Sequence, residues 1–111
     1  MSASANSVST HVLDAAAGTP AAGVNVTLFA ASGVELARAR TDGDGRVAQL
    51  AADLEPGIHR LRFDTAEYFA GLGVPAFYPE VVVAFDLGVR GGHHHIPLLL
   101  SPFAYSTYRG S

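Results

Sequence analysis

The sequence predicts an all-β fold, a sandwich of short strands, on three observations. Apolar and polar residues alternate over short runs, which is the period of a strand and not of a helix. Gly, Pro and Asp residues separate the runs, and these residue types favour turns. Eight such runs fit into 111 residues. That spacing is typical of a β-sandwich or barrel.

Eight strands are expected, and a glycine or proline bounds most of them on at least one side. The bounding residues include Gly18, Gly33, Pro56, Pro79, Gly92 and Pro102. The predicted strands are Ser9–Asp14, Val24–Ala30, Glu35–Thr41, Arg46–Leu50, Ile58–Asp64, Glu80–Leu87, His94–Leu100 and Ala104–Tyr108. We therefore expect two layers of strands around one core.

One segment departs from the strand pattern and predicts a short helix over residues 64–71. Asp64 is a suitable N-cap, and the residues after it form an acidic first turn. An apolar face follows, and Gly71 is a residue that commonly ends a helix.

The segment Asp42-Gly43-Asp44-Gly45 has the chemistry of a hairpin turn. Gly allows a positive φ, and Asp caps turns with its own side chain. The turn would join two strands and project Arg46 from the start of the second. A calcium loop is a poorer interpretation, because Asp53 stands where such a loop needs a glutamate and Arg46 falls on a ligand position.

Length and composition limit the domain organisation. A chain of 111 residues, 49% apolar and 15% charged, builds one hydrophobic core and is not disordered. We assign residues 9–111 to a single domain and residues 1–8 to a short flexible N-terminal extension. The apolar surplus in so small a domain also predicts burial between subunits.

Charge and residue usage exclude several classes of function. The net charge is −3, there is no lysine, and the seven arginines are scattered along the sequence, so nucleic acid is not an expected partner. Cysteine is absent, which excludes disulfides. No apolar run approaches the roughly eighteen residues that span a bilayer. The first residues lack the pattern of a signal peptide, and we expect a cytoplasmic protein.

Three consecutive imidazoles, His93–His95, open one predicted strand. Residues i and i+2 of a strand share a face, so His93 and His95 point one way and His94 the other. Three consecutive strand residues cannot converge on one zinc ion, and no cysteine is available. We expect no metal and no organic cofactor. His11, on the first strand, is a further candidate for chemistry.

Aromatic, cationic and hydroxyl groups gather in the last four residues, Tyr108–Ser111. Neither Ser106 nor Ser111 lies in the Gly-x-Ser-x-Gly turn of a serine hydrolase. Arg109 alone is equally consistent with a solvated charge. By their chemistry, these residues indicate a sandwich with a His, Arg and Ser site and do not name a reaction.

Together, four segments of the sequence resemble the transthyretin-related 5-hydroxyisourate hydrolases. The segments are Thr10-His11-Val12-Leu13-Asp14, Gly45-Arg46, His93 through Pro102, and Tyr108-Arg109-Gly110-Ser111. The resemblance extends from Ser9 onward. Its most specific part is the final tetrapeptide, which distinguishes the hydrolases from transthyretin, the hormone carrier on the same fold.

The resemblance implies a prealbumin-like sandwich of two four-stranded sheets and a homotetramer with active sites at the dimer–dimer interface. It further implies catalytic roles for His11, Arg46, His95 and Ser111. Tyr108, Arg109 and Gly110 would bind the substrate. His94 departs from the family, which often has tyrosine there. The implied reaction opens 5-hydroxyisourate by hydrolysis, to 2-oxo-4-hydroxy-4-carboxy-5-ureidoimidazoline, during urate degradation.

The residues support an acid–base pair of imidazoles in that reaction but leave open whether His11 or His95 activates water. Two other classes of protein compete with the hydrolase. One is a non-catalytic transthyretin-like protein that binds a flat aromatic molecule. The other is a structural sandwich module, for which the turn-rich segments Gly18–Val24 and Thr41–Arg46 are the weak support.

Overall fold

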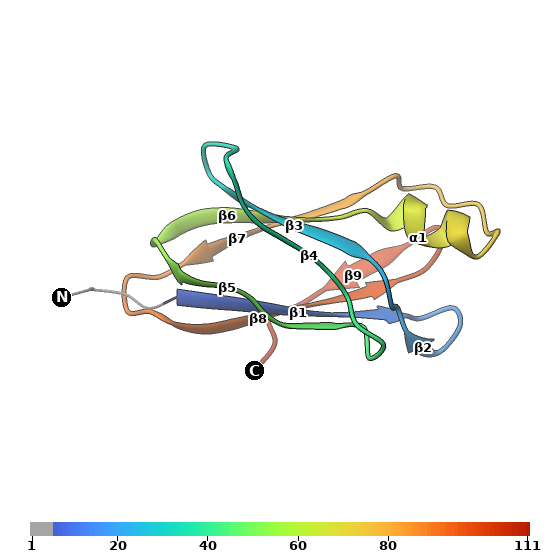
Figure 1. Ribbon diagram of the computed structural model, residues 1–111, viewed down its shortest axis with the longest axis horizontal. Helices are drawn as coiled ribbons and strands as arrows, with labels where there is room; N and C mark the ends of the chain where they lie inside the picture. The colour runs from blue at the N-terminus through green and yellow to red at the C-terminus, as the bar shows by residue number, and fades with distance from the viewer. Residues whose placement is uncertain (1–5) are drawn as a thin grey trace.

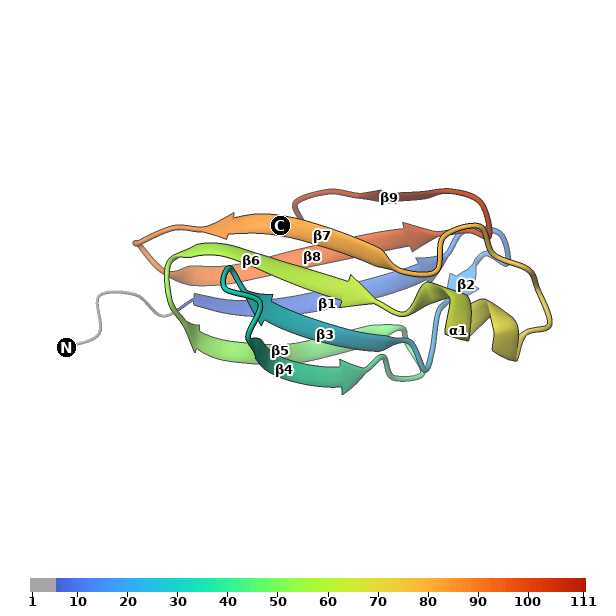
Figure 2. The same ribbon diagram turned by 90° about the horizontal axis from the view of Figure 1, so that it is seen from above.

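Two β-sheets pack face to face in the computed structural model, which describes residues 6–111 (Figures 1 and 2). The first sheet contains β1 (Asn6–Asp14), β2 (Thr19–Pro20), β5 (Arg46–Leu54), β8 (Gly92–Leu100) and β9 (Tyr105–Thr107). The second contains β3 (Asn25–Ala30), β4 (Glu35–Arg40), β6 (Gly57–Phe63) and β7 (Val81–Leu87). One helix, α1 (Thr65–Gly71), lies between β6 and β7 in the chain. The predicted sandwich with one short helix is confirmed.

Strand β1 is the centre of the first sheet. It pairs with β8 in parallel along its whole length, from Asn6 opposite Gly92 to Asp14 opposite Leu100. Its other edge is shared by β5 and by the two-residue strand β2, both antiparallel to it. The short β2 was not predicted, and it makes the first sheet five-stranded where four strands were expected. The second sheet runs in the order β4-β3-β6-β7.

Alternation along these strands builds the core between the sheets. On β1, Val8 and Val12 are fully buried, and on β8 the same holds for Leu98. The core residues are Val8, Val12, Ala21, Val24, Val26, Leu28, Leu50, Leu54, Leu61, Phe63, Phe69, Val81, Leu87, Ile96, Leu98 and Leu100. Since neighbouring strand residues face opposite ways, the odd-numbered residues of β1 and β8 lie on the outer face of the first sheet.

The boundary between extension and domain differs from the expectation. Strand β1 begins at Asn6 and not at Ser9, because residues 6–8 pair with β8 and β5. The amide of Asn6, fully buried, donates to the Gly88 carbonyl at 2.9 Å and ties this end of β1 to the β7–β8 loop. Residues 6–8 therefore belong to the domain, and residues 1–5 of the predicted extension lie outside the described residues.

The turn at residues 42–45 is confirmed, but it is not a hairpin. The strands that it joins lie in different sheets, since β4 pairs with β3 and β5 pairs with β1. The chain therefore crosses from one layer to the other at this turn (Figure 1). Its local chemistry is as predicted, because Asp42 Oδ1 accepts the backbone N–H groups of Asp44 (2.9 Å) and Arg46 (3.0 Å).

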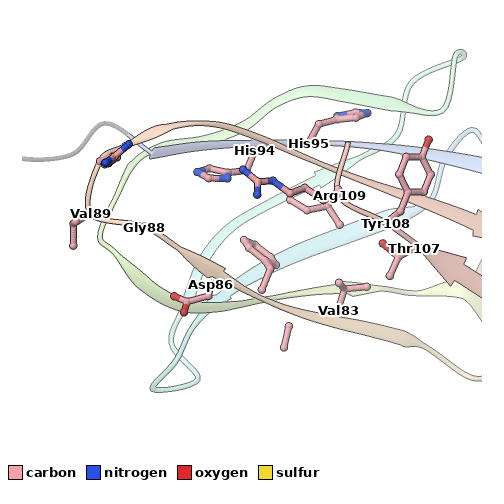
Figure 3. A pocket seen from close by; sticks show the side chains of 14 residues that line it. Val83, Asp86, Gly88, Val89, His94, His95, Thr107, Tyr108 and Arg109 are labelled. Carbon is pink, nitrogen blue, oxygen red and sulfur yellow. The ribbon is translucent and has the colours of Figure 1, made fainter. Parts of the chain in front are cut away.

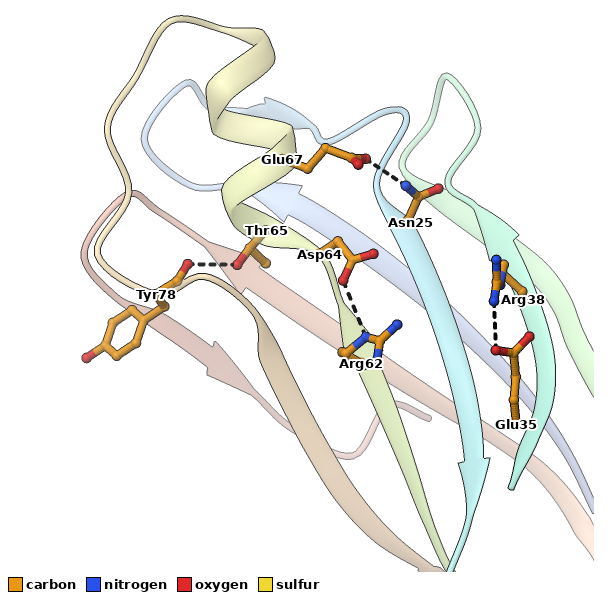
Figure 4. A network of polar contacts seen from close by, with 8 residues as sticks. All are labelled: Asn25, Glu35, Arg38, Arg62, Asp64, Thr65, Glu67 and Tyr78. Atoms are coloured by element: carbon orange, nitrogen blue, oxygen red, sulfur yellow. Dashed lines mark hydrogen bonds and ion pairs between the residues drawn. The ribbon is translucent and has the colours of Figure 1, made fainter. Parts of the chain in front are cut away.

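Helix α1 closes one end of the sandwich and buries Phe69. Asp64 is the N-cap residue as predicted, but its side chain makes no capping hydrogen bond; it pairs with Arg62, with Nε and Oδ1 3.4 Å apart (Figure 4). Asn25 of β3 donates to Glu67 of the helix at 2.6 Å. The helix ends at Gly71, as predicted, and the positive φ of +70° that follows it lies at Gly73.

No helix among residues 6–111 is long and apolar enough to cross a membrane.

Tyr68 of α1 anchors the helix to the end of β1. Its hydroxyl donates to Asp14 Oδ2 at 2.8 Å, and Asp14 Oδ1 accepts the N–H groups of Ala16 and Ala17. Burial, with the hydrogen bond to Asp14 and its negative charge, raises the pKa of Tyr68 to about 12. One buried carboxylate thus holds both the helix and the turn after β1.

We predict that Tyr68→Phe destabilises the protein, because the Asp14 carboxylate, 2% exposed, loses a charge-assisted hydrogen bond. Such a bond contributes about 1.5–3 kcal/mol. The free energy of unfolding, measured with urea, should fall by that amount. Tyr105→Phe is the control, since the Tyr105 side chain is 43% exposed. Equal midpoints for the two variants would contradict the prediction.

Candidate active site

The outer face of the first sheet brings together residues that are far apart in the sequence. The β1–β8 register places Ser9 opposite His95, and the β1–β5 register places His11 opposite Arg46. Paired residues of neighbouring strands project to the same side of a sheet. Two imidazoles and a guanidinium from three strands therefore share this face.

A hollow of about 300 Å³ on this face is the candidate active site, and we call it the outer hollow. It is lined by Ser9, Thr10, Arg46, Ala48, His93, His95 and Ser111. Three of the predicted catalytic residues, Arg46, His95 and Ser111, thus line one hollow. The fourth, His11, is not among the lining residues; it lies beside the hollow, opposite Arg46.

The turn before β5 holds His11 and Arg46 in place. His11 Nε2 donates to the Asp44 carbonyl at 2.9 Å, so neutral His11 carries its lone pair on Nδ1. Asp42 accepts the Arg46 N–H at 3.0 Å. Hydrogen bonds from the Arg46 and Asp44 backbones, with a smaller contribution from the charges of Arg46 and His11, hold the pKa of Asp42 below its ordinary value.

Gly45 lets this turn lie against β1. The Val12 N–H donates to the Gly45 carbonyl at 2.7 Å. Gly45 has a φ of +75°, and a Cβ at this position would lie 2.3 Å from the Val12 carbonyl oxygen. No side chain fits there, so the position of Arg46 depends on this glycine.

The surroundings of His95 favour its neutral form. Burial is the largest cause of its lowered pKa, followed by the positive charge of Arg46 and by His11 and His93. Its Nδ1 lies 2.7 Å from Ser9 Oγ. Within residues 6–111 no hydrogen bond is made to Nε2, which leaves that nitrogen available to a ligand.

The last residues fold back over His95. Strand β9 pairs with β8 up to Thr107 opposite Leu98, and Pro97, which has no N–H, follows in the register. The pairing resumes at Gly110, whose N–H donates to the His95 carbonyl at 2.9 Å. A Cβ on Gly110 would lie 2.7 Å from His95 Cδ2. The tail can therefore lie against the imidazole, with Ser111 at the hollow, only because residue 110 is glycine.

A larger cavity of about 750 Å³ lies on the other side of β8, between the two sheets (Figure 3). We call it the inner cavity. Segments of β7, the β7–β8 loop, β8 and the tail line it, including Val83, Phe85, His94, Ile96, Tyr108 and Arg109. His94 points into it and donates to Asn6 Oδ1 at 3.1 Å, turned away from Ser9 and His95 as the alternation predicts.

Tyr108 and Arg109, to which the family resemblance gave substrate binding, line the inner cavity and not the outer hollow. The guanidinium of Arg109 lies beside His94 in Figure 3. Burial, followed by the charges of Arg109 and His93, lowers the pKa of His94. In a single chain, the tail thus contributes Ser111 to one site and Arg109 to the other.

Sequence reasoning overlooked Ser9, which lies between two imidazoles. Its Oγ is 2.8 Å from His93 Nε2 and 2.7 Å from His95 Nδ1. The spacing Ser7-x-Ser9 matches His93-x-His95 with the period of a strand. That match becomes a signal only when β1 is known to pair with β8.

Within the part of the chain that the structure describes, no group of three or more His, Asp or Glu side chains is arranged to hold a metal ion.

The fold and the polar outer hollow define a transthyretin-like sandwich, and solved structures agree. A Klebsiella pneumoniae 5-hydroxyisourate hydrolase superimposes with a TM-score of 0.89 at 38% identity, covering 96% of this chain and 100% of that one. Transthyretin from Sparus aurata gives a TM-score of 0.85 at 34% identity, with coverages of 93% and 95%.

Residues 8–110 match the model of the HIUase/Transthyretin family, and the chain belongs to that family. A probable 5-hydroxyisourate hydrolase of Schizosaccharomyces pombe is 46% identical over 110 residues, 91% of this chain and 88% of the relative. The 5-hydroxyisourate hydrolase of Pseudomonas aeruginosa is 40% identical over 114 residues, 94% and 90%. By this relationship, the chain is an enzyme of the hydrolase class.

A titration of His95 tests whether Arg46 lowers its pKa. We expect His95 to titrate below 6.5, the ordinary value, and Arg46→Gln to raise its pKa because a nearby positive charge is removed. NMR titration of the His95 ring signals measures both. Arg60→Gln, on β6 in the other sheet, should leave the midpoint unchanged. An unchanged midpoint in Arg46→Gln would show that Arg46 does not act on His95.

Proposed function

We propose that this protein hydrolyses 5-hydroxyisourate, opening its six-membered ring to give 2-oxo-4-hydroxy-4-carboxy-5-ureidoimidazoline. The observation that carries the proposal is the outer hollow, where His95, Arg46 and Ser111 converge beside His11. The names of the relatives and of the Klebsiella structure point to the same substrate.

Ring opening by water requires three catalytic groups from the protein. A base must remove a proton from the attacking water, a cation must stabilise the oxyanion that forms on the ring carbonyl, and an acid must protonate the departing nitrogen. The outer hollow and its rim contain two imidazoles and one guanidinium that can fill these three roles.

His95 is the better candidate for the base. Its lowered pKa keeps the imidazole neutral near pH 7, and its Nε2 has no partner within the described residues. His11 is then the candidate acid. To protonate the departing nitrogen, His11 must enter the reaction as the imidazolium; its Nε2–H is held by the Asp44 carbonyl, so the proton that it gives is the one on Nδ1.

Arg46 stabilises the oxyanion in this proposal. It lines the hollow together with His95, and its charge already acts on the His95 ring. Removal of one donor of this kind commonly costs about a hundred- to a thousandfold in rate.

The tail completes the substrate site. Ser111 lines the hollow, and the backbone of Gly110 covers His95. We assign direct substrate contact to these two residues. Tyr108 and Arg109 line the inner cavity, which His95 also lines, and they remain candidates for substrate binding from that side.

Assembly into a homotetramer, with sites at the dimer–dimer interface, is part of the proposal. Strands β7 and β9 are the outermost strands of their sheets on the same side of the sandwich (Figure 2). Large side chains with apolar surface are exposed there, including Val82 of β7 at 45% and Tyr105 of β9 at 43%. Unpaired edges with apolar neighbours favour association with further strands. A monomeric mass in solution would remove this part of the proposal.

The similarity to transthyretin keeps a carrier function as the second candidate. The polar lining of the outer hollow favours chemistry over storage of an apolar ligand. Ring opening of freshly prepared 5-hydroxyisourate, followed by ultraviolet absorbance, separates the two. A carrier would bind the compound and leave its decay at the spontaneous rate.

We predict that His95→Ala reduces kcat by about a hundredfold or more, because a positioned base contributes that much. The kcat/KM of the unsubstituted protein should fall on the acid side with an apparent pKa below 6.5, as His95 gains its proton. Arg60→Ala is the control, because Arg60 is exposed and lies on β6 in the other sheet. Full activity in His95→Ala would exclude His95 as the base.

We further predict that Gly110→Ala lowers activity without unfolding the protein, since the added Cβ would displace the tail from His95. Removal of residues 109–111 should have at least as large an effect. Gly71→Ala, which meets no atom within 4 Å, is the matched control. If both tail variants turn over substrate at the unaltered rate, the tail has no part in the reaction.

A further inference from the structure

Four side chains on the outer face form one continuous hydrogen-bonded row, Ser7–His93–Ser9–His95, which we call the serine–histidine row. Ser7 Oγ lies 2.7 Å from His93 Nδ1, and Ser9 Oγ lies 2.8 Å from His93 Nε2. The row ends at His95 Nδ1, 2.7 Å from Ser9 Oγ. Both nitrogens of His93 and the inner nitrogen of His95 are therefore engaged.

The sheet register produces this row. In the parallel β1–β8 pair, Ser7 is opposite His93 and Ser9 is opposite His95. Neighbouring strands lie about 4.8 Å apart, so a serine reaches its own partner and the imidazole diagonal to it. Ser9 is only 5% exposed, which keeps solvent from competing for its hydroxyl, whereas His93 is exposed.

The hydroxyl of Ser9 has one proton and two nitrogen neighbours. It donates to one imidazole and accepts an N–H from the other, so the protonation states of His93 and His95 are linked. When Nδ1 of His95 carries the proton, Ser9 donates to His93 Nε2, and His93 Nδ1–H donates to Ser7. In that arrangement Nε2 of His95 holds a lone pair, which a base requires.

We propose that Ser9 and His93 are positioning residues that set the proton of His95 and carry its charge away during turnover. The proposal rests on the proposed function, in which His95 removes a proton from water. Neither residue needs to touch the substrate, because both act through His95.

Removal of a proton from water moves two further protons along the serine–histidine row. Nε2 of His95 takes a proton from water; its Nδ1 proton passes to Ser9 Oγ, and the original Ser9 proton passes to His93 Nε2. His95 is then neutral, and His93 carries the positive charge with Nδ1–H still donated to Ser7. After the product leaves, His95 releases its Nε2 proton to solvent, and the two transfers along the row reverse.

The surrounding charges favour the movement of the positive charge from His95 to His93. Arg46 of β5 and His11 of β1 act on His95 and disfavour a second positive charge there. His93 is the more exposed of the two rings, and water stabilises a charge on it better. The carboxylates of Asp42 and Asp44 lie in the turn on the far side of β1 from β8, and His94 and Arg109 lie across β8.

Ser9→Ala tests the proposal with two measurements. We expect kcat to fall about tenfold or more, with KM changed less than twofold. A positioned base contributes roughly a hundredfold in rate, and part of that contribution is lost when the lone pair of His95 no longer lies on Nε2. Nitrogen NMR of the free protein should show His95 protonated at Nδ1, and Ser9→Ala should shift it toward Nε2. Ser9→Thr, which keeps a hydroxyl, should restore both. Ser106→Ala on β9 is the serine control.

His93→Gln should lower kcat and should be rescued in part by imidazole buffer, which can take up the proton. Unchanged kcat and unchanged His95 protonation in Ser9→Ala would overturn the proposal, as would a loss confined to KM or to stability. If the unsubstituted protein does not open 5-hydroxyisourate, the proposed function fails, while the NMR measurement still decides whether Ser9 sets the His95 proton.

Discussion

The parallel pairing of β1 with β8 is the constraint on which the rest of this molecule depends. It runs from Asn6 to Asp14 in unbroken register and fixes which residues of both strands face the core. The same register aligns the serines of β1 with the histidines of β8 on the outer face. A shift of β8 by one residue against β1 would turn Leu98 outward and His93 and His95 toward the core, so the core and the site are specified by one pairing.

Two close backbone approaches bring the remaining parts of the site to this pair. Gly45 lies against the Val12 carbonyl and delivers Arg46 beside His11. Gly110 lies against His95 and delivers Ser111 to the hollow. Both positions exclude a Cβ, for steric reasons that involve other strands. The arginine and the terminal serine are therefore positioned by glycines that carry no chemistry themselves.

The electrostatic design of the site is consistent with base chemistry. His95 is half-buried beside a guanidinium, a setting that favours the neutral ring, while its inner nitrogen is held by a buried hydroxyl. On the opposite side of β8, Arg109 has the same effect on His94. Alternation along one strand thus turns adjacent imidazoles to opposite sides: His95 lines both the outer hollow and the inner cavity, whereas His94 lines the inner cavity and not the outer hollow.

The sequence by itself determined the strands other than β2, the helix, the Asp42–Gly45 turn and the opposite orientations of His94 and His95, because these follow from local periodicity and turn chemistry. It also carried the resemblance through which His11, Arg46 and Ser111 became candidates. Tertiary structure alone decided that the turn crosses between sheets, that β1 begins at Asn6, and that Tyr108 and Arg109 face the inner cavity. It also revealed Ser9, because a hydroxyl acquires two imidazole neighbours only when strands distant in sequence pair in a particular register, and register is not a local property.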